Sequence, residues 1–194
     1  AIHPNRRYLY AVNEVDELDG RTGGGVSSFS IAPGTGDLTF MNRQPSGGGL
    51  PCYVSVEQTG CHALVANYGT GSVAVFPIRE DGQLGEASDF VQHRGASVKD
   101  RQEGPHAHCF VPDPANRYGM AADLGLDKIL VYKLDLANGN LIPNEGPLAQ
   151  VSDGSGPRHF VFHQNRRYAY VINELASTIT AFAYDETNGT LKEL

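Results

Sequence analysis

Short apolar runs recur along this chain, and each of them ends in Asn or Asp. The four end residues are Asn13, Asn67, Asp123 and Asn173, at separations of 54, 56 and 50 residues. A period of this size marks a repeat architecture, in which one repeat cannot bury its own apolar face. The four segments that carry the pattern are Tyr8–Glu14, Ala63–Tyr68, Gly119–Leu124 and Tyr168–Glu174.

Each complete repeat predicts four short strands joined by turns rich in Gly, Asn and Asp. The second and third repeats open their first strands with Leu50-Pro51 and Gly104-Pro105, and the fourth opens with Gly156-Pro157. No segment keeps a 3.6-residue apolar period over ten residues, so the pattern does not predict helices. In the third repeat the predicted strands are Pro105–Val111, Tyr118–Asp123, Ile129–Leu134 and one near Leu141–Pro147.

The predicted fold is an all-β propeller of four-stranded antiparallel blades. A β-sandwich also has many short strands, but it does not account for a Pro-led first strand in each repeat. About 3.7 blades are present, so the chain predicts part of a larger ring with open blade edges that favour self-association. We expect a single partial propeller domain over residues 1–194, with blades at about 1–50, 51–104, 105–156 and 157–194. The fourth repeat is expected to stop just after its turn ETNGT.

Composition narrows the function classes. The net charge of −7 argues against nucleic acid as a partner, because phosphates attract Lys and Arg clusters. No stretch approaches the roughly 18 apolar residues that span a bilayer, and no signal-peptide pattern is visible. The three cysteines are odd in number and show no CxxC spacing. Reduced thiols and a cytoplasmic setting are therefore expected.

The first strand of each blade in a propeller lines the central channel, so we look for candidate catalytic residues on and beside these strands. Two histidines, His106 and His108, open the first strand of the third repeat, and Arg158 opens that of the fourth. Glu14 and Glu174 follow the second strands of the first and fourth repeats. Histidine and glutamate can act as general bases, and arginine can bind a carboxylate or phosphate with two parallel hydrogen bonds.

Structural interpretations compete with these functional ones. The recurring Asn and Asp residues, Asn173 included, can satisfy backbone groups at strand ends. His159 follows Arg158 and, by strand alternation, is expected to face the blade interior. The HAH spacing at 106–108 also suits a metal site, but no nearby carboxylate or Cys completes a tetrahedral set. We expect no metal and no cofactor.

The motifs GPHAH (Gly104–His108), SGPRHFVFHQNRRYAYVINEL (Ser155–Leu175) and STITAFAY (Ser177–Tyr184) resemble the lactonase family of seven-bladed β-propellers. Its bacterial members include 6-phosphogluconolactonases, and fungal carboxy-cis,cis-muconate cyclase is a relative. The resemblance covers essentially the whole chain but only about half of a family member. It implies a metal-independent site of His, Arg and Glu, which falls by motif on His106 or His108, Arg158 and Glu174.

The predicted activity is hydrolysis of a sugar lactone, with 6-phospho-D-glucono-1,5-lactone as the leading substrate. Arg158, Glu14 and Asn173 are the expected substrate-binding residues, and His106, His108, Arg158 and Glu174 the expected catalytic ones. Two alternatives stay open at this point: a muconate-lactonising cyclase and a non-catalytic propeller that binds proteins or small ligands. The sequence leaves open which of His106 and His108 faces the channel.

Overall fold

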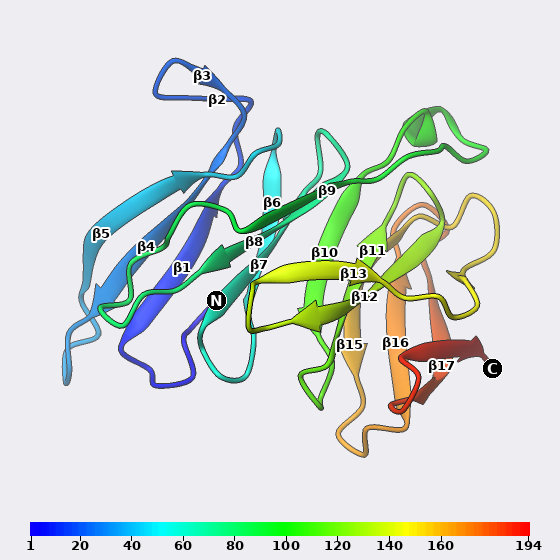
Figure 1. Ribbon diagram of the computed structural model, residues 1–194. Coiled ribbons are helices and arrows are strands. Elements are labelled where there is room, and N and C mark those ends of the chain that lie inside the picture. Colours follow the sequence, from blue (N-terminus) through cyan, green and yellow to red (C-terminus); the bar gives the residue numbers. More distant parts are fainter.

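The computed structural model describes all residues 1–194 and divides them among four antiparallel sheets and one small hairpin (Figure 1). Blade 1 contains β1 (Tyr8–Asn13), β4 (Gly25–Ile31) and β5 (Leu38–Pro45). Blade 2 contains β6 (Pro51–Val56), β7 (His62–Asn67), β8 (Ser72–Pro77) and β9 (Asp89–Gln92). Blade 3 contains β10 (Ala107–Pro112), β11 (Tyr118–Asp123), β12 (Lys128–Asp135), β13 (Asn140–Pro143) and β14 (Ala149–Gln150). Blade 4 contains β15 (Pro157–Phe162), β16 (Tyr168–Asn173), β17 (Thr178–Asp185) and β18 (Thr190–Glu193).

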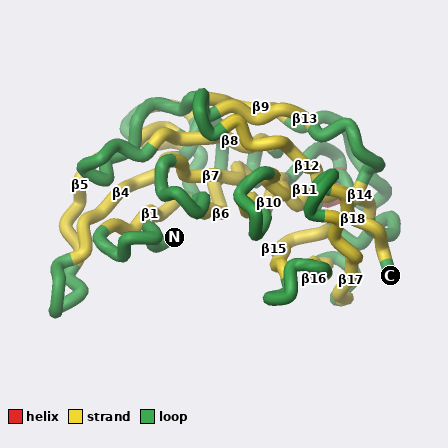
Figure 2. The backbone as a smooth tube through the Cα atoms, turned by 60° about the horizontal axis from the view of Figure 1, so that its bottom comes forward, coloured by secondary structure: helices red, strands yellow, loops and turns green.

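The four sheets form an arc, with β6, β10 and β15 on its concave side and β5, β9 and β13 on its convex side (Figure 2). Neighbouring blades pack face to face, and β10 contacts both β6 and β15. Apolar side chains of β7 and β8, such as Leu64 and Val75, form one buried cluster with Phe110 and Tyr132 of blade 3. The predicted all-β, four-stranded antiparallel architecture is confirmed.

Several predicted elements differ from the observed ones. The fourth repeat does not stop after its turn, because β18 (Thr190–Glu193) completes a four-stranded sheet. The hairpin of β2 (Glu17–Leu18) and β3 (Arg21–Thr22) was not predicted. The outer strand of blade 2 begins at Asp89, and the Leu84 carbonyl before it accepts a 2.8 Å hydrogen bond from the Asn42 side chain of blade 1. The structure's only helix is the three-residue η1 (Asp100–Gln102), and no helix could span a membrane.

Tyr8 at the start of β1 and Tyr118 at the start of β11 each pack against a turn glycine of the following blade. A Cβ on Gly82 would lie 2.4 Å from Tyr8, and a Cβ on Gly189 would lie 2.5 Å from Tyr118. Both glycines adopt positive φ angles, +85° and +64°, which residues with a Cβ rarely adopt. Tyr168 holds the equivalent position in blade 4 and is 36% exposed, because no later sheet of this chain covers it.

The first strand of blades 2, 3 and 4 carries a register shift at the same position. The strand pairing skips one residue between Pro51 and Tyr53, between Ala107 and Cys109, and between Pro157 and His159. A β-bulge of this kind leaves one residue unpaired and redirects its side chain, often beside an active site. The skipped residues are Cys52, His108 and Arg158.

Candidate active site

A single carboxylate joins two arginines at the inner edge of the arc. Glu174 directly follows β16, and its Oε2 atom lies 2.8 Å from Nε of Arg158. Its Oε1 atom lies 2.8 Å from Nη1 of Arg101, which belongs to η1 in the connection between blades 2 and 3. The Nε–H of Arg158 makes no aligned hydrogen bond, so this contact is an ion pair held by charge. The cluster therefore carries one more positive than negative charge.

Tyr68 extends the cluster toward the two histidines of blade 3. Its hydroxyl accepts a 3.0 Å hydrogen bond from Nη2 of Arg101. The His106 ring stacks on the Tyr68 ring at 4.6 Å, and its Nδ1 atom lies 2.9 Å from the Tyr68 carbonyl oxygen. The His108 ring meets the same Tyr68 ring edge-on at 5.7 Å. Both histidines thus contact the same Tyr68 ring, although His106 lies before β10 and His108 is its bulged residue, so strand alternation does not account for their proximity.

His108 is a neutral imidazole in this site. Burial and the neighbouring positive charge of Arg158 lower its pKa to about 4. Its Nδ1 atom is buried without a hydrogen-bond partner, and its ring lies edge-on to His159 at 5.2 Å. The imidazole is therefore uncharged at neutral pH and has a lone pair that can accept a proton, although it is a weaker base than an ordinary histidine. Its position as the bulged residue of β10 distinguishes it from His106, which lies before the strand.

Glu174 is better placed to orient cations than to remove protons. Burial acts to raise its pKa, but the hydrogen bond and charge of Arg101 and the charge of Arg158 outweigh burial and hold that pKa below its usual value. A carboxylate between two guanidinium groups stays ionised and is a weak base. Its two oxygens instead fix the positions of Arg101 and Arg158 before any ligand arrives.

The structure brings together His106, His108, Arg158 and Glu174, and Asn173 lines the hollow beside Arg158 and Glu174. Asn173 is buried, and its amide donates to Oγ1 of Thr178 at 3.1 Å and of Thr180 at 2.8 Å. Glu14 is exposed and makes no hydrogen bond or ion pair.

His159 corrects the prediction that it faces the blade interior. It is exposed beside His108, because the bulge at Arg158 interrupts strand alternation. Arg101 was missed, although the long charged connection in which it lies is a signal, since long loops in compact domains are often functional.

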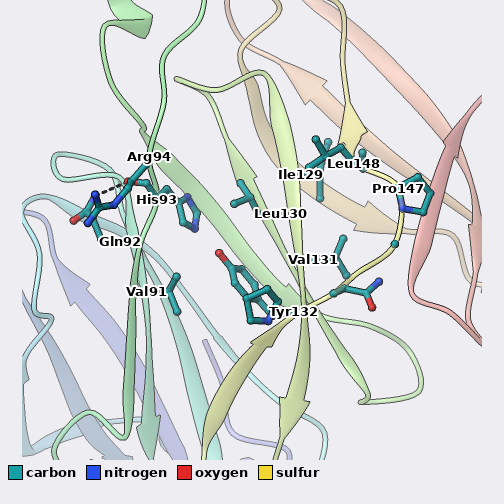
Figure 3. Close-up of a pocket in the computed structure, with 14 residues that line it drawn as sticks. Val91, Gln92, His93, Arg94, Ile129, Leu130, Val131, Tyr132, Pro147 and Leu148 are labelled. Atoms are coloured by element: carbon teal, nitrogen blue, oxygen red, sulfur yellow. Dashed lines mark hydrogen bonds between the residues drawn. The ribbon is translucent and has the colours of Figure 1, made fainter.

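Two hollows differ in their chemistry. One of about 680 Å³ is lined by Arg158, Asn173 and Glu174 with Ile172, Ser177, Thr178 and Ile179 of blade 4. Another of about 330 Å³ lies between β9 and β12, where His93 and Tyr132 stand among apolar side chains (Figure 3). The second hollow shares no lining residue with the first and lacks an arginine–carboxylate pair. The charged hollow adjoins the arginine–carboxylate cluster through Arg158 and Glu174, whereas Arg101, His106 and His108 do not line it. The candidate active site is therefore the cluster itself together with the two histidines.

The fold and this cluster define a β-propeller with a charged cleft at its channel mouth. The chain belongs to the lactonase family of seven-bladed β-propellers, since the family profile described as "Lactonase, 7-bladed beta-propeller" matches residues 1–194. The membership predicted from the motifs is confirmed.

Similar proteins include two named 6-phosphogluconolactonase. The one from Bacillus subtilis is 39% identical over 194 residues, covering 100% of this chain and 53% of the relative. The one from Formosa agariphila is 37% identical over 195 residues, covering 100% of this chain and 54% of the relative. The structure of Pseudomonas aeruginosa periplasmic gluconolactonase, PpgL, superposes with a TM-score of 0.91 at 35% identity, covering 100% of this chain and 55% of that one. The chain spans about half the length of the curated relatives it matches.

Proposed function

We propose that the protein containing this chain hydrolyses a sugar lactone, with 6-phospho-D-glucono-1,5-lactone converted to 6-phosphogluconate. One observation carries the proposal: an ionised carboxylate holds two arginines beside a neutral, partly enclosed histidine. Ester hydrolysis needs a proton acceptor for the attacking water and positive charge for the developing oxyanion. The names of the two relatives at 39% and 37% identity support the same substrate.

In the proposed reaction, His108 accepts a proton from water as the water oxygen attacks the lactone carbonyl carbon. Arg158 stabilises the oxyanion that forms on the carbonyl oxygen. Collapse of this intermediate breaks the ring C–O bond, and the proton returns to the ring oxygen that leaves. Glu174 keeps Arg158 in place throughout.

The test is lactone hydrolysis by the whole protein and by its Arg158→Ala and Glu174→Ala variants. We expect turnover to fall about 100-fold or more in Arg158→Ala, the size seen when one oxyanion donor is removed. Undiminished turnover in both variants overturns the site assignment. A parallel assay with a muconate separates this proposal from the cyclase alternative, which uses the arginines to hold substrate carboxylates.

A cytoplasmic location is part of the proposal. Cys52, Cys61 and Cys109 are all unpaired, as expected for a reducing compartment. Cell fractionation followed by immunodetection tests this, and recovery in the periplasmic fraction contradicts it.

A further inference from the structure

The connection between β9 and β10 places the guanidinium of Arg101 beside Glu174 in the candidate site. Hydrogen bonds to blade 3 hold this connection in place. Gln102 is fully buried and donates a 2.8 Å hydrogen bond to the Leu124 carbonyl oxygen. Ser97 donates to Oδ2 of Asp127 at 2.5 Å, and the Ser97 amide is bonded to the Gln102 carbonyl at 2.9 Å. Arg101 is therefore held on an anchored loop while its own side chain is 55% exposed.

Arg101 keeps much of its hydrogen-bonding capacity unused. A guanidinium offers five N–H donors, and the contacts to Tyr68 and Glu174 engage only Nη2 and Nη1. Glu174 can neutralise only one of its two arginine partners. Arg101, Arg158 and Glu174 together thus carry one surplus positive charge, while the exposed Glu103 carboxylate lies 3.9 Å from Nε2 of His106. The planar guanidinium of Arg101 suits phosphate oxygens.

The two arginines differ in their relation to the proton acceptor. The charge of Arg158 acts on the His108 imidazole, whereas the Arg101 guanidinium bonds the Tyr68 hydroxyl and Glu174. Arg158 comes from the bulge beside His108, whereas Arg101 reaches Glu174 from the outer loop. In a 6-phosphorylated 1,5-lactone, C6 carries the phosphate and is attached to C5, which bonds the ester ring oxygen, so the phosphate arm and the carbonyl flank the same ring oxygen. Arg101 and Arg158 both contact Glu174, so a substrate with its carbonyl at Arg158 has a second guanidinium available for its phosphate.

We propose that Arg101 is a specificity-determining residue that binds the phosphate of a phosphorylated lactone, while Arg158 serves the ester. This inference rests on the proposed function. Tyr68 and Glu174 act as positioning residues that hold the Arg101 fork open toward the substrate. The arrangement is formed before binding, which lowers the entropic cost of ordering the side chain.

The decisive experiment compares two substrates in the whole protein: the 6-phosphorylated lactone and unphosphorylated glucono-1,5-lactone. In Arg101→Gln, we expect kcat/KM on the phosphorylated lactone to fall about 10- to 100-fold, mainly through KM, as for loss of a charge-assisted hydrogen-bonding partner. We expect kcat/KM on the unphosphorylated lactone to stay within about threefold of wild type. Arg101→Lys keeps the positive charge but loses the planar guanidinium with its paired donors, so it should retain only part of the preference for the phosphorylated lactone.

Lys99→Gln is the matched control. Lys99 lies on the same loop and donates to the Leu175 carbonyl at 3.1 Å, so this variant removes a charge and a loop contact without touching Arg101. We expect its substrate preference to match wild type. An equal fall on both lactones in Arg101→Gln, or an unchanged ratio, overturns the proposal.

Titration with inorganic phosphate separates failure of this inference from failure of the proposed function. If wild type hydrolyses neither lactone, the lactonase proposal fails. Phosphate that binds wild type and binds Arg101→Gln at least about tenfold more weakly still supports an Arg101 anion site. Equal phosphate affinity in the two proteins overturns that site, whatever the enzymatic result.

Discussion

The Nδ1 atom of His93 lies 2.6 Å from Oδ2 of Asp123, and both side chains are fully buried. The other carboxylate oxygen, Oδ1, accepts backbone N–H bonds from His106, Gly125 and Leu126 at 2.8, 3.0 and 3.2 Å. One carboxylate thus joins the outer connection of blade 2 to the segment that carries the active-site histidines of blade 3.

Removing this carboxylate should destabilise the fold more than any surface change. In Asp123→Ala, the buried imidazole and three amides lose their acceptor, and we expect a loss of about 3–5 kcal/mol in the free energy of unfolding. Urea denaturation measures it, with Asp37→Ala, an exposed turn residue, as the control. Equal midpoints for the two variants would contradict a structural role for Asp123.

The aromatic–glycine contact between blades can be separated from backbone strain. Gly82 and Gly36 have similar φ angles, +85° and +78°, but a Cβ on Gly82 meets the Tyr8 ring whereas one on Gly36 meets nothing within 4 Å. Gly36→Ala should cost about 1–2 kcal/mol, the usual cost of a left-handed residue with a Cβ. Gly82→Ala should cost at least about 1 kcal/mol more, because the ring must move. Thermal or urea unfolding of both variants gives the comparison, and equal losses would show that the ring yields freely.

Stability should fall as the pH drops from about 6.5 toward 4. Burial and then the Arg158 charge lower the pKa of His108 to about 4, so the unfolded chain binds a proton in this range and the folded chain does not. Burial also lowers the pKa values of His62 and His159, and their contributions have the same sign. The His108 contribution amounts to about 3 kcal/mol when the drop is complete.

His108→Gln should flatten this pH dependence, since glutamine does not titrate. Urea titrations between pH 7.5 and 4.5 measure the slope in both proteins. Carboxylates begin to titrate in the lower part of this range, but they do so in both proteins, so the difference between the two slopes reports His108. Parallel slopes in wild type and variant would show that His108 titrates normally in the folded state.

Glu174→Gln should separate anion binding from turnover. The amide keeps the shape but removes the negative charge between Arg101 and Arg158, so the net charge of the cluster rises by one. We expect inorganic phosphate to bind about tenfold more tightly at low salt, while lactone turnover falls because the arginines lose their orienting partner. Weaker phosphate binding in the variant would show that the positioning of Arg101 by Glu174 outweighs the positive charge that Glu174 neutralises.

Local patterns predicted the repeated strands well and the site only in part. The second strand of the third repeat agrees with its predicted bounds, Tyr118–Asp123, because a short apolar run and a terminal Asp define it locally. The bulges at His108 and Arg158 were not predicted, since a register shift depends on pairing between strands. Arg101 lies outside the repeat, so no equivalent residue in another blade drew attention to it.

The recurring bulge also describes how such a site can change over evolution. Cys52 occupies in blade 2 the position that His108 and Arg158 occupy in blades 3 and 4. Blades 2, 3 and 4 each supply one side chain at the bulge, on a backbone whose conformation the rest of the sheet maintains. A lineage can therefore acquire a new substrate by exchanging single residues at this position while every blade keeps its packing.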